Sequence, residues 1–404
     1  MRASFCVPLW AAVLLAPAAF AQADGGLSPE DQKLLDEIKA ATPEPAQQPA
    51  AAAAPAAPTP GAQALNAFSN LFNPAMSANG LLLGKYSSAP FGPDDSPFGL
   101  ELQELELQFM ANVDPYFTAR LVLSIPSGEG LEVEEGYVSA IPQPLGLGFR
   151  GGKMRQAFGR ENPLHTHGLP FIERSLVGND VMGGEGLSEV GLEATWLAPL
   201  PWYALFTAVG MDGANEALFG SKNGRDFAGF FAVKNVWDLW DDATLEAGVS
   251  YTLGNNLDRR LAQALSGHLV FKWKPARDAK NHSIELAVEG IVARRPAASD
   301  NLEPPKYETV GGYAYLQVQL WRGWYLAGRY EFLGHQTAPE SFTGVPVETD
   351  MTMRQSAVLV FAPTEFSAFR LQVSVAEPPG GADPIVTGML QVNFTIGAHP
   401  AHAY

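Results

Sequence analysis

The chain is patterned mainly by apolar and polar residues that alternate one by one over strand-length runs. The run ATLEAGVSYTLG, from Ala243 to Gly254, shows the pattern clearly. Its odd-numbered positions are all apolar, and its even-numbered positions are polar residues or glycine. A period of two places these two sets on opposite faces of one β-strand. The run therefore predicts a strand with one apolar face and one polar face.

Similar runs recur from residue 79 to residue 396 and are joined by connections that alternate between short and usually longer. They predict about sixteen strands, an even number as bacterial membrane barrels require. The predicted strands span residues 79–87, 98–110, 115–125, 130–141, 145–155, 186–198, 202–212, 226–236, 243–254, 266–274, 282–293, 309–321, 323–334, 351–362, 366–376 and 385–396. We therefore predict an all-β fold, an up-and-down antiparallel transmembrane β-barrel with lipid outside and water inside.

A soluble β-sandwich would alternate in the same way, so the tryptophans are needed to separate the two folds. Beyond residue 65, the tryptophans flank connections at one end of the predicted strands: Trp196, Trp202, Trp237, Trp240, Trp273, Trp321 and Trp324. Amphipathic aromatic rings gather at membrane interfaces, whereas tryptophans of a soluble core have no reason to prefer one end. This pattern favours the membrane barrel and predicts that this end faces the periplasm.

The N-terminus predicts export through a cleaved signal peptide. Residues 1–23 combine Arg2, an apolar stretch over 7–20 and small residues near a cleavage position. We expect residues 24–64 to form a periplasmic extension, with a short helix over 28–41 and a linker rich in Ala and Pro. The barrel is expected over residues 65–404. The single cysteine, Cys6, lies in the signal, so the remainder offers no cysteine metal site.

Composition and motifs exclude several classes of function. The formal net charge of −17 argues against nucleic acid as a partner, because nucleic acid favours clustered Lys and Arg. The chain has no Gly-rich phosphate loop, no Gly-x-Ser-x-Gly and no His-Glu-x-x-His motif. We therefore predict that the protein is not an enzyme and needs no cofactor. Its expected partners are outer-membrane lipid and small solutes or ions.

The connection 156–185 would be the third outer loop, and it carries most of the polar candidates for a pore constriction. With the adjoining strand end these are Arg155, Arg160, Glu161, Asn162, His165, His167, Glu173, Arg174, Asp180 and Glu185. The apolar run Leu169–Ile172 indicates a loop that folds inward and packs. His165 and His167 could hold a zinc or copper ion, since imidazole and carboxylate suit those metals. Their spacing is not that of a helix-borne zinc motif, so we favour hydrogen bonding of the loop to the barrel wall.

The polar positions of the clearest strands should line the lumen. The acidic candidates are Glu104, Glu106, Glu193, Glu246, Glu285, Glu289 and Glu331, and the basic candidates are Arg120, Lys272, Lys274, Arg329, Arg354 and Arg370. This mixture of signs does not choose between cations and anions, and several of these residues can pair with one another.

A series of short motifs, which occur in order from about Asn73 to the C-terminus, resembles the outer-membrane porins of the phosphate-selective porin O/P type. The motifs are Asn73-Pro74-Ala75, Val113-Asp114-Pro115-Tyr116, Glu134-Glu135-Gly136-Tyr137, Gly152-Lys153-Met154-Arg155, Phe158-Gly159-Arg160, Asn162-Pro163-Leu164-His165, Pro170-Phe171-Ile172-Glu173-Arg174 and Gly184-Glu185-Gly186-Leu187. The resemblance implies a sixteen-strand channel, often a homo-trimer, with an inward third loop. The ladder of arginines and lysines on which phosphate selectivity depends in the namesake members cannot be traced here.

The sequence thus predicts a passive channel of the bacterial outer membrane for small hydrophilic solutes or ions. One alternative is an outer-membrane binding or structural barrel that is plugged by its loops. That alternative includes a metal-uptake component, because relatives with a His-x-His loop are sometimes labelled as zinc-linked. A further alternative is a soluble exported β-protein.

Overall fold

The computed structural model describes residues 74–89, 96–128, 130–140, 144–220, 226–257, 259–296, 306–337 and 349–397. The chain divides into two units, Met1–Gln63 and Ala64–Tyr404, and the described residues all belong to the second. The signal peptide and the extension that the sequence predicts over residues 1–64 lie outside the described residues and stay predictions.

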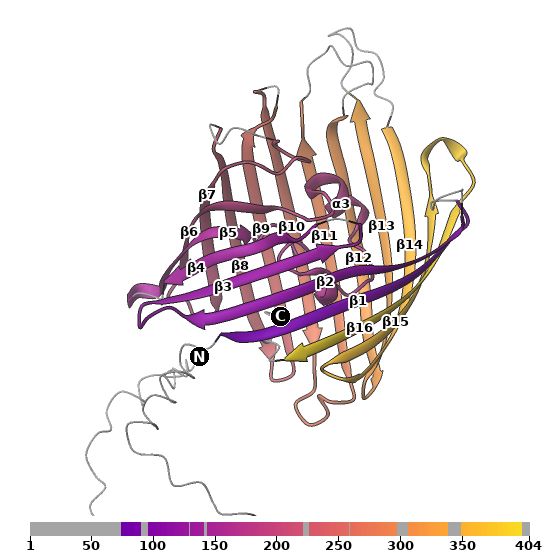
Figure 1. Cartoon of the computed structure of the whole chain (residues 1–404), viewed down its shortest axis with the longest axis horizontal. Helices are drawn as coiled ribbons and strands as arrows, with labels where there is room; N and C mark the ends of the chain where they lie inside the picture. The colour runs from indigo at the N-terminus through magenta and orange to yellow at the C-terminus, as the bar shows by residue number, and fades with distance from the viewer. Residues whose placement is uncertain are drawn as a thin grey trace, which may run out of the picture. The chain divides into compact units, whose positions relative to one another are not determined.

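The second unit is a closed antiparallel barrel of sixteen strands in sequential order (Figure 1). The strands are β1 (Ala75–Ser87), β2 (Phe98–Asn112), β3 (Phe117–Pro126), β4 (Glu132–Ala140), β5 (Leu147–Arg155), β6 (Ser188–Leu197), β7 (Tyr203–Met211), β8 (Ala228–Trp240), β9 (Ala243–Asn255), β10 (Leu261–Trp273), β11 (Ser283–Arg294), β12 (Lys306–Trp321), β13 (Trp324–Thr337), β14 (Thr349–Thr364), β15 (Ser367–Glu377) and β16 (Ile385–Gly397). Short helical turns are η3 (Pro144–Gly146), η4 (Thr166–Gly168), α3 (Leu176–Met182) and η5 (Pro379–Gly381). None of the helices in the described ranges is long and apolar enough to cross a membrane.

The predicted fold class, strand number and up-and-down order are confirmed, and each predicted strand overlaps an observed one. Several strand ends differ from the predicted ones, and two of these differences bear on named residues. Strand β8 ends at Trp240 and not at residue 236, so Trp237 and Trp240 lie in the end of the strand beside the turn. Lys274 lies beyond the end of β10, where its backbone N–H donates to the Asp242 carbonyl at 2.8 Å, so it is not a lumen residue of that strand.

The barrel closes where the first strand pairs with the last. Strands β1 and β16 pair from Ser77–Gly397 to Ser87–Thr387 in one unbroken register. On the inner face of this seam, the Asn79 side-chain amide donates to Asn393 Oδ1 at 2.8 Å and to Thr395 Oγ1 at 2.7 Å. With this seam, each of the sixteen described strands has a hydrogen-bonded neighbour on both sides, as a barrel in a hydrocarbon environment requires.

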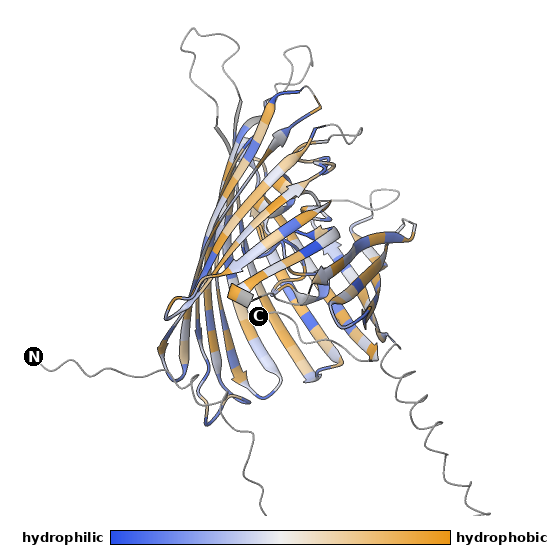
Figure 2. Cartoon of the chain, turned by 90° about the vertical axis from the view of Figure 1, so that its left-hand side faces the viewer, coloured by the Kyte–Doolittle hydropathy of each residue, from blue (hydrophilic) through white to orange (hydrophobic). Residues whose placement is uncertain are grey.

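Hydrophobic and hydrophilic residues alternate along the strands (Figure 2). The exposure of the side chains places the apolar set mainly on the outward face and the polar set mainly on the inward face. Leu359, Leu371 and Leu390 are register partners across β14, β15 and β16, and all three are exposed on the outward face. Their neighbours Gln372 and Gln391 point inward and are fully buried. A soluble protein rarely leaves such rows of leucine uncovered, so the outward face is suited to an apolar surrounding.

Aromatic side chains form a belt at the end of the barrel that carries the β6–β7, β8–β9 and β12–β13 turns. Ring centroids lie 5.5 Å apart for Trp196–Phe206, 6.5 Å for Trp202–Trp237, 6.1 Å for Trp240–Phe271, 5.8 Å for Trp321–Trp324 and 4.5 Å for Trp324–Phe361. These contacts bring the tryptophans of different turns to one end of the strands, as the sequence predicts. Such belts are typical of membrane interfaces.

The outward face yields a test of its surroundings at Leu371, in the middle of β15. We predict that Leu371→Arg lowers the free energy of unfolding in a lipid bilayer by about 2–4 kcal/mol, because hydrocarbon cannot solvate a guanidinium group. The same substitution at Leu145, which is exposed in the turn before β5, should cost about 0–1 kcal/mol. Denaturant unfolding of both variants in vesicles measures the difference, and equal costs would contradict contact with hydrocarbon.

Candidate functional site

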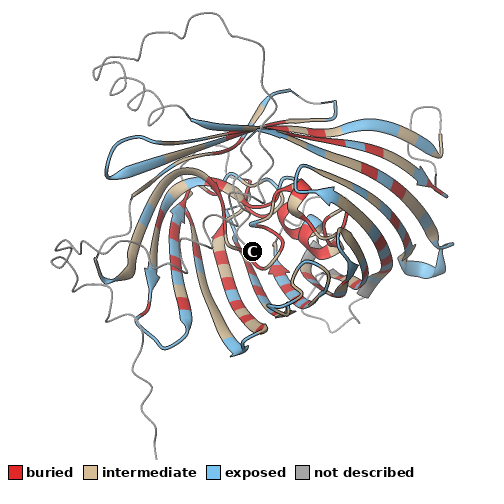
Figure 3. Cartoon of the chain, turned by 90° about the horizontal axis from the view of Figure 1, so that it is seen from below, coloured by how far each residue is buried: buried red, intermediate tan, exposed pale blue. Residues whose placement is uncertain are grey.

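The connection between β5 and β6, residues 156–187, folds into the barrel and is called the inner segment below. It contains η4 and α3, and seen along the barrel it lies within the ring of strands (Figure 3). Most of its side chains are buried although it is a connection, among them Phe158, Asn162, Phe171 and Val181. The predicted inward path of the third loop is therefore what the structure has, with the end of the loop at Leu187.

Apolar packing holds the inner segment against the wall formed by β7 to β14. Phe158, Val177 and Val181 pack against Phe230 of β8 and Ile291 of β11. Phe171 enters a second cluster of wall side chains, Val270, Ala287, Tyr313, Tyr315, Ala327 and Val358. Ile172 packs separately against Leu83 of β1 and Met389 of β16. Burial of a side chain such as Phe171 contributes about 1.5–3 kcal/mol, so these contacts fix the segment in the lumen.

Inward polar groups of β9, β11, β13 and β15 bind the backbone of the inner segment. Gly159 N–H donates to Ser250 Oγ of β9 at 2.9 Å, and Arg160 N–H donates to Glu289 Oε2 of β11 at 3.1 Å. Leu176 N–H donates to Glu331 Oε1 of β13, and Ile172 N–H donates to Gln372 Oε1 of β15, both at 2.8 Å. The lumen side chains thus satisfy backbone donors that have no strand partner.

Arg329 of β13 is the centre of a buried ion-pair network. Its Nε lies 2.9 Å from Glu331 Oε2, and its Nη1 lies 3.4 Å from Glu161 Oε1 of the inner segment. The guanidinium carbon lies 4.4 Å from the centroid of the Phe171 ring. Arg354 of β14 extends the network, with Nε 2.8 Å from Glu331 Oε2 and Nη1 3.1 Å from Glu173 Oε2. A buried charge without a partner is costly, so each of these groups depends on the others.

Helix α3 of the inner segment is fixed by an N-terminal cap and by contacts of Asp180. Ser175 caps this helix, since its hydroxyl accepts the Gly178 N–H at 3.2 Å. Asp180 pairs with Arg295, which also donates to the Asp180 carbonyl at 2.8 Å. His335 Nε2 of β13 lies 3.5 Å from Asp180 Oδ1. Asp180 therefore attaches helix α3 to Arg295, which follows β11, and to His335 of β13. Its carboxylate is engaged in these contacts.

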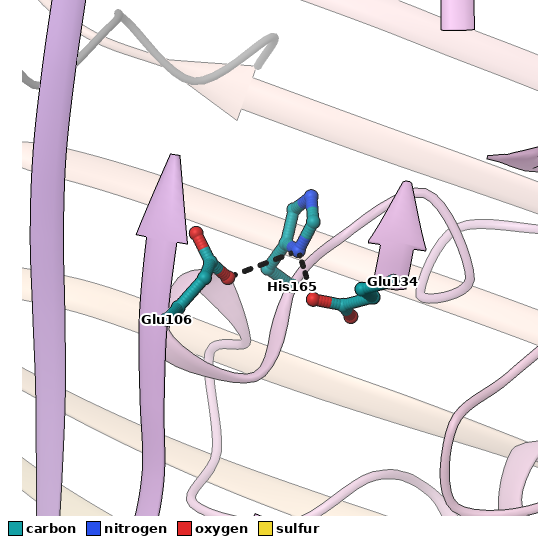
Figure 4. Close-up of side chains that lie close together, drawn as sticks. All are labelled: Glu106, Glu134 and His165. Carbon is teal, nitrogen blue, oxygen red and sulfur yellow. Dashed lines mark hydrogen bonds and ion pairs between the residues drawn. The ribbon is translucent and has the colours of Figure 1, made fainter. Parts of the chain in front are cut away.

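On the opposite wall, three carboxylates converge on His165 of the inner segment, and Figure 4 shows two of them, Glu106 and Glu134. His165 Nδ1 lies 3.1 Å from Glu106 Oε2 of β2 and 3.1 Å from Glu134 Oε2 of β4, while its Nε2 lies 3.3 Å from Glu135 Oε2. His167 Nδ1 lies 3.4 Å from Glu106 Oε2. All five side chains are buried. We call them the His165 cluster.

Two arginines lie against the carboxylates of this cluster. Arg155 pairs with Glu134 Oε1 through its guanidinium and donates its backbone N–H to Glu135 Oε1 at 3.1 Å. Arg120 Nε lies 3.5 Å from Glu135 Oε2. Burial alone would lower the pKa of His165, but the carboxylates of Glu106 and Glu135 raise it above its ordinary value. The three carboxylates therefore favour a positive charge at the position of the imidazole.

A β-bulge explains why two consecutive glutamates both point inward. Val122 of β3 pairs with Glu135 and Leu123 pairs with Val133, so Glu134 is an extra residue in β4. Glu134 and Glu135 are each 4% exposed, whereas strict alternation would place one of them on the outward face. This is why the sequence did not identify them as site residues, although they stand in one of the motifs quoted above.

A cavity of about 240 Å³ remains between the inner segment and the wall of β2 and β3. Charged groups of both signs line it, namely Glu104, Arg155, Glu173, Arg174 and Glu185. Arg174 is held by the carbonyls of Glu161 at 3.2 Å and Leu164 at 3.0 Å, and Arg155 Nη1 donates to the Glu185 carbonyl at 2.7 Å. The cavity therefore lies beside the His165 cluster and has charged groups held in fixed positions in its wall, next to apolar side chains such as Leu169 and Ile172.

Most of the candidates from the sequence fall into three groups in the structure. The first group meets at the cavity and comprises Arg155, Arg174, Glu173, Glu185 and Glu104. The second lies at the His165 cluster: His165, His167 and Glu106 belong to it, and Arg120 contacts it through Glu135. The third group attaches the inner segment to the far wall, which is the part of the barrel from β7 to β15. It comprises Arg160, Glu161, Asp180, Glu285, Glu289, Arg329, Glu331, Arg354 and Arg370. Arg370 of β15 donates to the His167 carbonyl at 3.1 Å. Asn162 binds within the segment itself. Glu193 pairs with Arg150, and Glu246 pairs with Lys234 and His268, so these two face the lumen away from the segment.

Lys272 of β10 pairs with Glu285 of the neighbouring strand β11 at 3.6 Å and so forms a cross-strand ion pair in the far wall. Besides Glu134 and Glu135, sequence reasoning missed Arg150, Arg295, Gln372 and the hydroxyls of Tyr313 and Tyr315. The two tyrosines donate to Glu289 at 2.6 Å and to Glu285 at 2.5 Å. Their inward alternation in β12 is a signal that could have found them.

Comparisons with known proteins agree with this fold. No protein-family model matches the chain. An uncharacterized protein of Aquifex aeolicus is 31% identical over 339 residues, which cover 76% of this chain and 70% of that protein. Among solved structures, OprB of Pseudomonas putida has a TM-score of 0.58 at 10% identity, covering 83% of this chain and 97% of that one. An anion-selective porin of Comamonas acidovorans has a TM-score of 0.53 at 9% identity, covering 80% and 100%. At these identities the likeness shows the fold.

Gly159 offers a test of how the inner segment is docked. Its φ is +64°, and a Cβ there would lie 1.7 Å from Glu289 Oε1. We predict that Gly159→Ala lowers the free energy of unfolding by about 1–3 kcal/mol from the backbone strain alone, with a further loss as Glu289 is displaced. Gly210→Ala, on the outward face with nothing within 4 Å, should change it by less than about 0.5 kcal/mol. Equal denaturant midpoints for the two variants would contradict tight docking at Gly159.

Proposed function

We propose that this chain, which belongs to the same family as the uncharacterized Aquifex aeolicus protein, is an outer-membrane channel for passive diffusion of small hydrophilic solutes or ions. The apolar outward face, the aromatic belt and the polar lumen support a location in a membrane. The similarity of the fold to OprB and to the anion-selective porin supports the outer membrane and the channel function. The trimeric assembly that the family resemblance implies stays a prediction.

The observation that carries this proposal is the path of the inner segment through the lumen. It binds β9, β11, β13 and β15 on one side and reaches β2 and β4 on the other. A segment in this place narrows the polar lumen to the space that it leaves free. The cavity beside β2 and β3 is such a space, and it is lined by charged groups held by their own hydrogen bonds. Small hydrated solutes are the class that such a space admits.

The charged groups at the cavity support a channel that does not select ions by the sign of their charge. Two arginines, Arg155 and Arg174, stand against three glutamates, Glu104, Glu173 and Glu185. A ring of one sign would be needed to exclude ions of that sign. We therefore propose passage of small polar solutes and of ions of both signs, with no selectivity for phosphate.

A second candidate function is a closed barrel that binds or anchors without conducting. The number of buried ion pairs around Arg329 favours it, because a segment held so firmly can act as a plug. Conductance separates the two candidates, since a plug carries no steady current.

We predict that the purified protein in a planar lipid bilayer gives discrete steps of ion current. In a variant with Glu185→Cys, and with Cys6 replaced by serine, a charged thiol reagent should lower the single-channel current, because residue 185 is exposed at the cavity. Leu371→Cys in the same background places the thiol on the outward face and is the matched control. Correctly folded protein without current, or a current insensitive to modification at residue 185, would contradict this path.

Release of the inner segment should widen the channel. Arg329→Met leaves Glu161 and Glu331 without their shared partner, and loss of one partner of a buried pair costs about 3–5 kcal/mol. We predict a severalfold rise in single-channel conductance. Arg150→Met is the control, because it breaks an ion pair with Glu193 that joins β5 to β6 and does not involve the inner segment. It should leave the single-channel conductance within about 20% of the wild-type value. An unchanged conductance in Arg329→Met would mean that the segment does not limit the current.

A further inference from the structure

The His165 cluster has more acceptors than protons to share among them. Glu106 Oε2 and Glu134 Oε2 both lie 3.1 Å from His165 Nδ1, which carries at most one hydrogen. The hydrogen bond of His165 Nδ1 is formed with Glu134 Oε2. Glu106 Oε2 then accepts no hydrogen bond, although Glu106 is only 4% exposed. A buried carboxylate oxygen without a hydrogen bond is costly, and here it points at two imidazole nitrogens and a second carboxylate.

The spacing of these atoms suits a metal ion in place of the Nδ1 hydrogen. The three donor atoms of Glu106, Glu134 and His165 lie within 4.8 Å of one another. Four ligands at zinc distances of about 2.0–2.1 Å in a tetrahedron are about 3.3 Å apart. The two nitrogen–oxygen distances of 3.1 Å from His165 are close to that spacing.

The surroundings also hold each donor in the orientation that a metal needs. His165 Nε2 faces Glu135 Oε2 at 3.3 Å, so Glu135 can take the second ring hydrogen and leave Nδ1 free as a ligand. Such a carboxylate behind a ligating histidine is a recurrent feature of metal sites. Glu134 is held at its other oxygen by Arg155. These contacts orient the cluster independently of any ion.

We propose that the His165 cluster binds one divalent transition-metal ion of the zinc type through His165 Nδ1, Glu106 Oε2 and Glu134 Oε2. One imidazole and two carboxylates suit zinc better than magnesium, which prefers oxygen ligands in an octahedron. His167 Nδ1, which lies 3.4 Å from Glu106 Oε2, is a further nitrogen beside these three donors. The ion joins β2, β4 and the inner segment, and the site does not depend on whether the barrel conducts.

Equilibrium dialysis of the full chain folded in detergent tests the proposal, with Zn²⁺ as the probe and magnesium in excess. We expect one zinc ion per chain. Glu106→Gln, which keeps the size of the side chain, and His165→Ala should each weaken binding at least tenfold. Heat-modified mobility on gels shows whether each variant is folded, and the two substitutions test the site independently of each other.

Two controls separate this site from other histidines. His268→Ala removes an inward imidazole that pairs with one carboxylate, Glu246, at 3.2 Å, and it should leave zinc binding unchanged. Replacement of His399 and His402 by alanine should also leave it unchanged. Bound Co²⁺ should give the visible absorption of a four-coordinate ion in the wild type and lose it in Glu106→Gln. The absence of zinc binding, binding that persists in folded Glu106→Gln and His165→Ala, or loss of binding in either control would overturn the proposal.

Discussion

Closure of the sheet by β1 and β16 is the constraint on which the rest of the structure depends. Once the ladder is closed, every strand has two partners, and side chains alternate between an outside and an inside wherever the register is regular. The outside is mainly apolar, with exposed rows such as Leu359, Leu371 and Leu390, so most polar residues of the strands face the lumen. A barrel of sixteen strands is too wide for its own side chains to fill, and space remains for another part of the chain. The inner segment occupies that space, and its path is a consequence of the width and polarity that closure imposes.

The inner segment and the lumen wall supply each other with partners for buried charges and for backbone N–H groups. Buried arginines and glutamates of β11, β13 and β14 would be costly beside apolar neighbours alone, and the inner segment has backbone donors without strand partners. Glu331 illustrates the exchange, since it pairs with Arg329 and Arg354 and also accepts the Leu176 N–H. The charges that looked in the sequence like a lining for solutes are to a large extent occupied with this docking. The part of the lumen left for solutes is smaller than a count of polar residues suggests.

The strands were predictable because the same rule acts on each of them: a shift of one residue would expose every apolar side chain to the lumen. The inward loop could also be anticipated, since Phe171 and Ile172 need apolar partners. Which partners they find was not predictable, because Tyr315, Leu83 and Met389 lie far away in the sequence. The bulge at Glu134 was missed for a related reason. Alternation assigns faces only while the register is regular, and one inserted residue brings two adjacent glutamates to the same side.

Ion pairs hold the inner segment on both sides, but the large apolar clusters lie on one side only, and this difference accounts for the place of the cavity. Toward β7 to β14 the ion pairs are accompanied by dense apolar clusters that contain Phe158, Phe171 and Val177. Toward β2 and β4 the attachment is charge compensation, in which Glu106, Glu134 and Glu135 need a positive charge at His165. Charge compensation acts at a few points and does not close the space around them, whereas apolar packing excludes water. The cavity accordingly lies beside the His165 cluster, and the cation that neutralises these carboxylates, a proton or a metal ion, fixes the position of its wall.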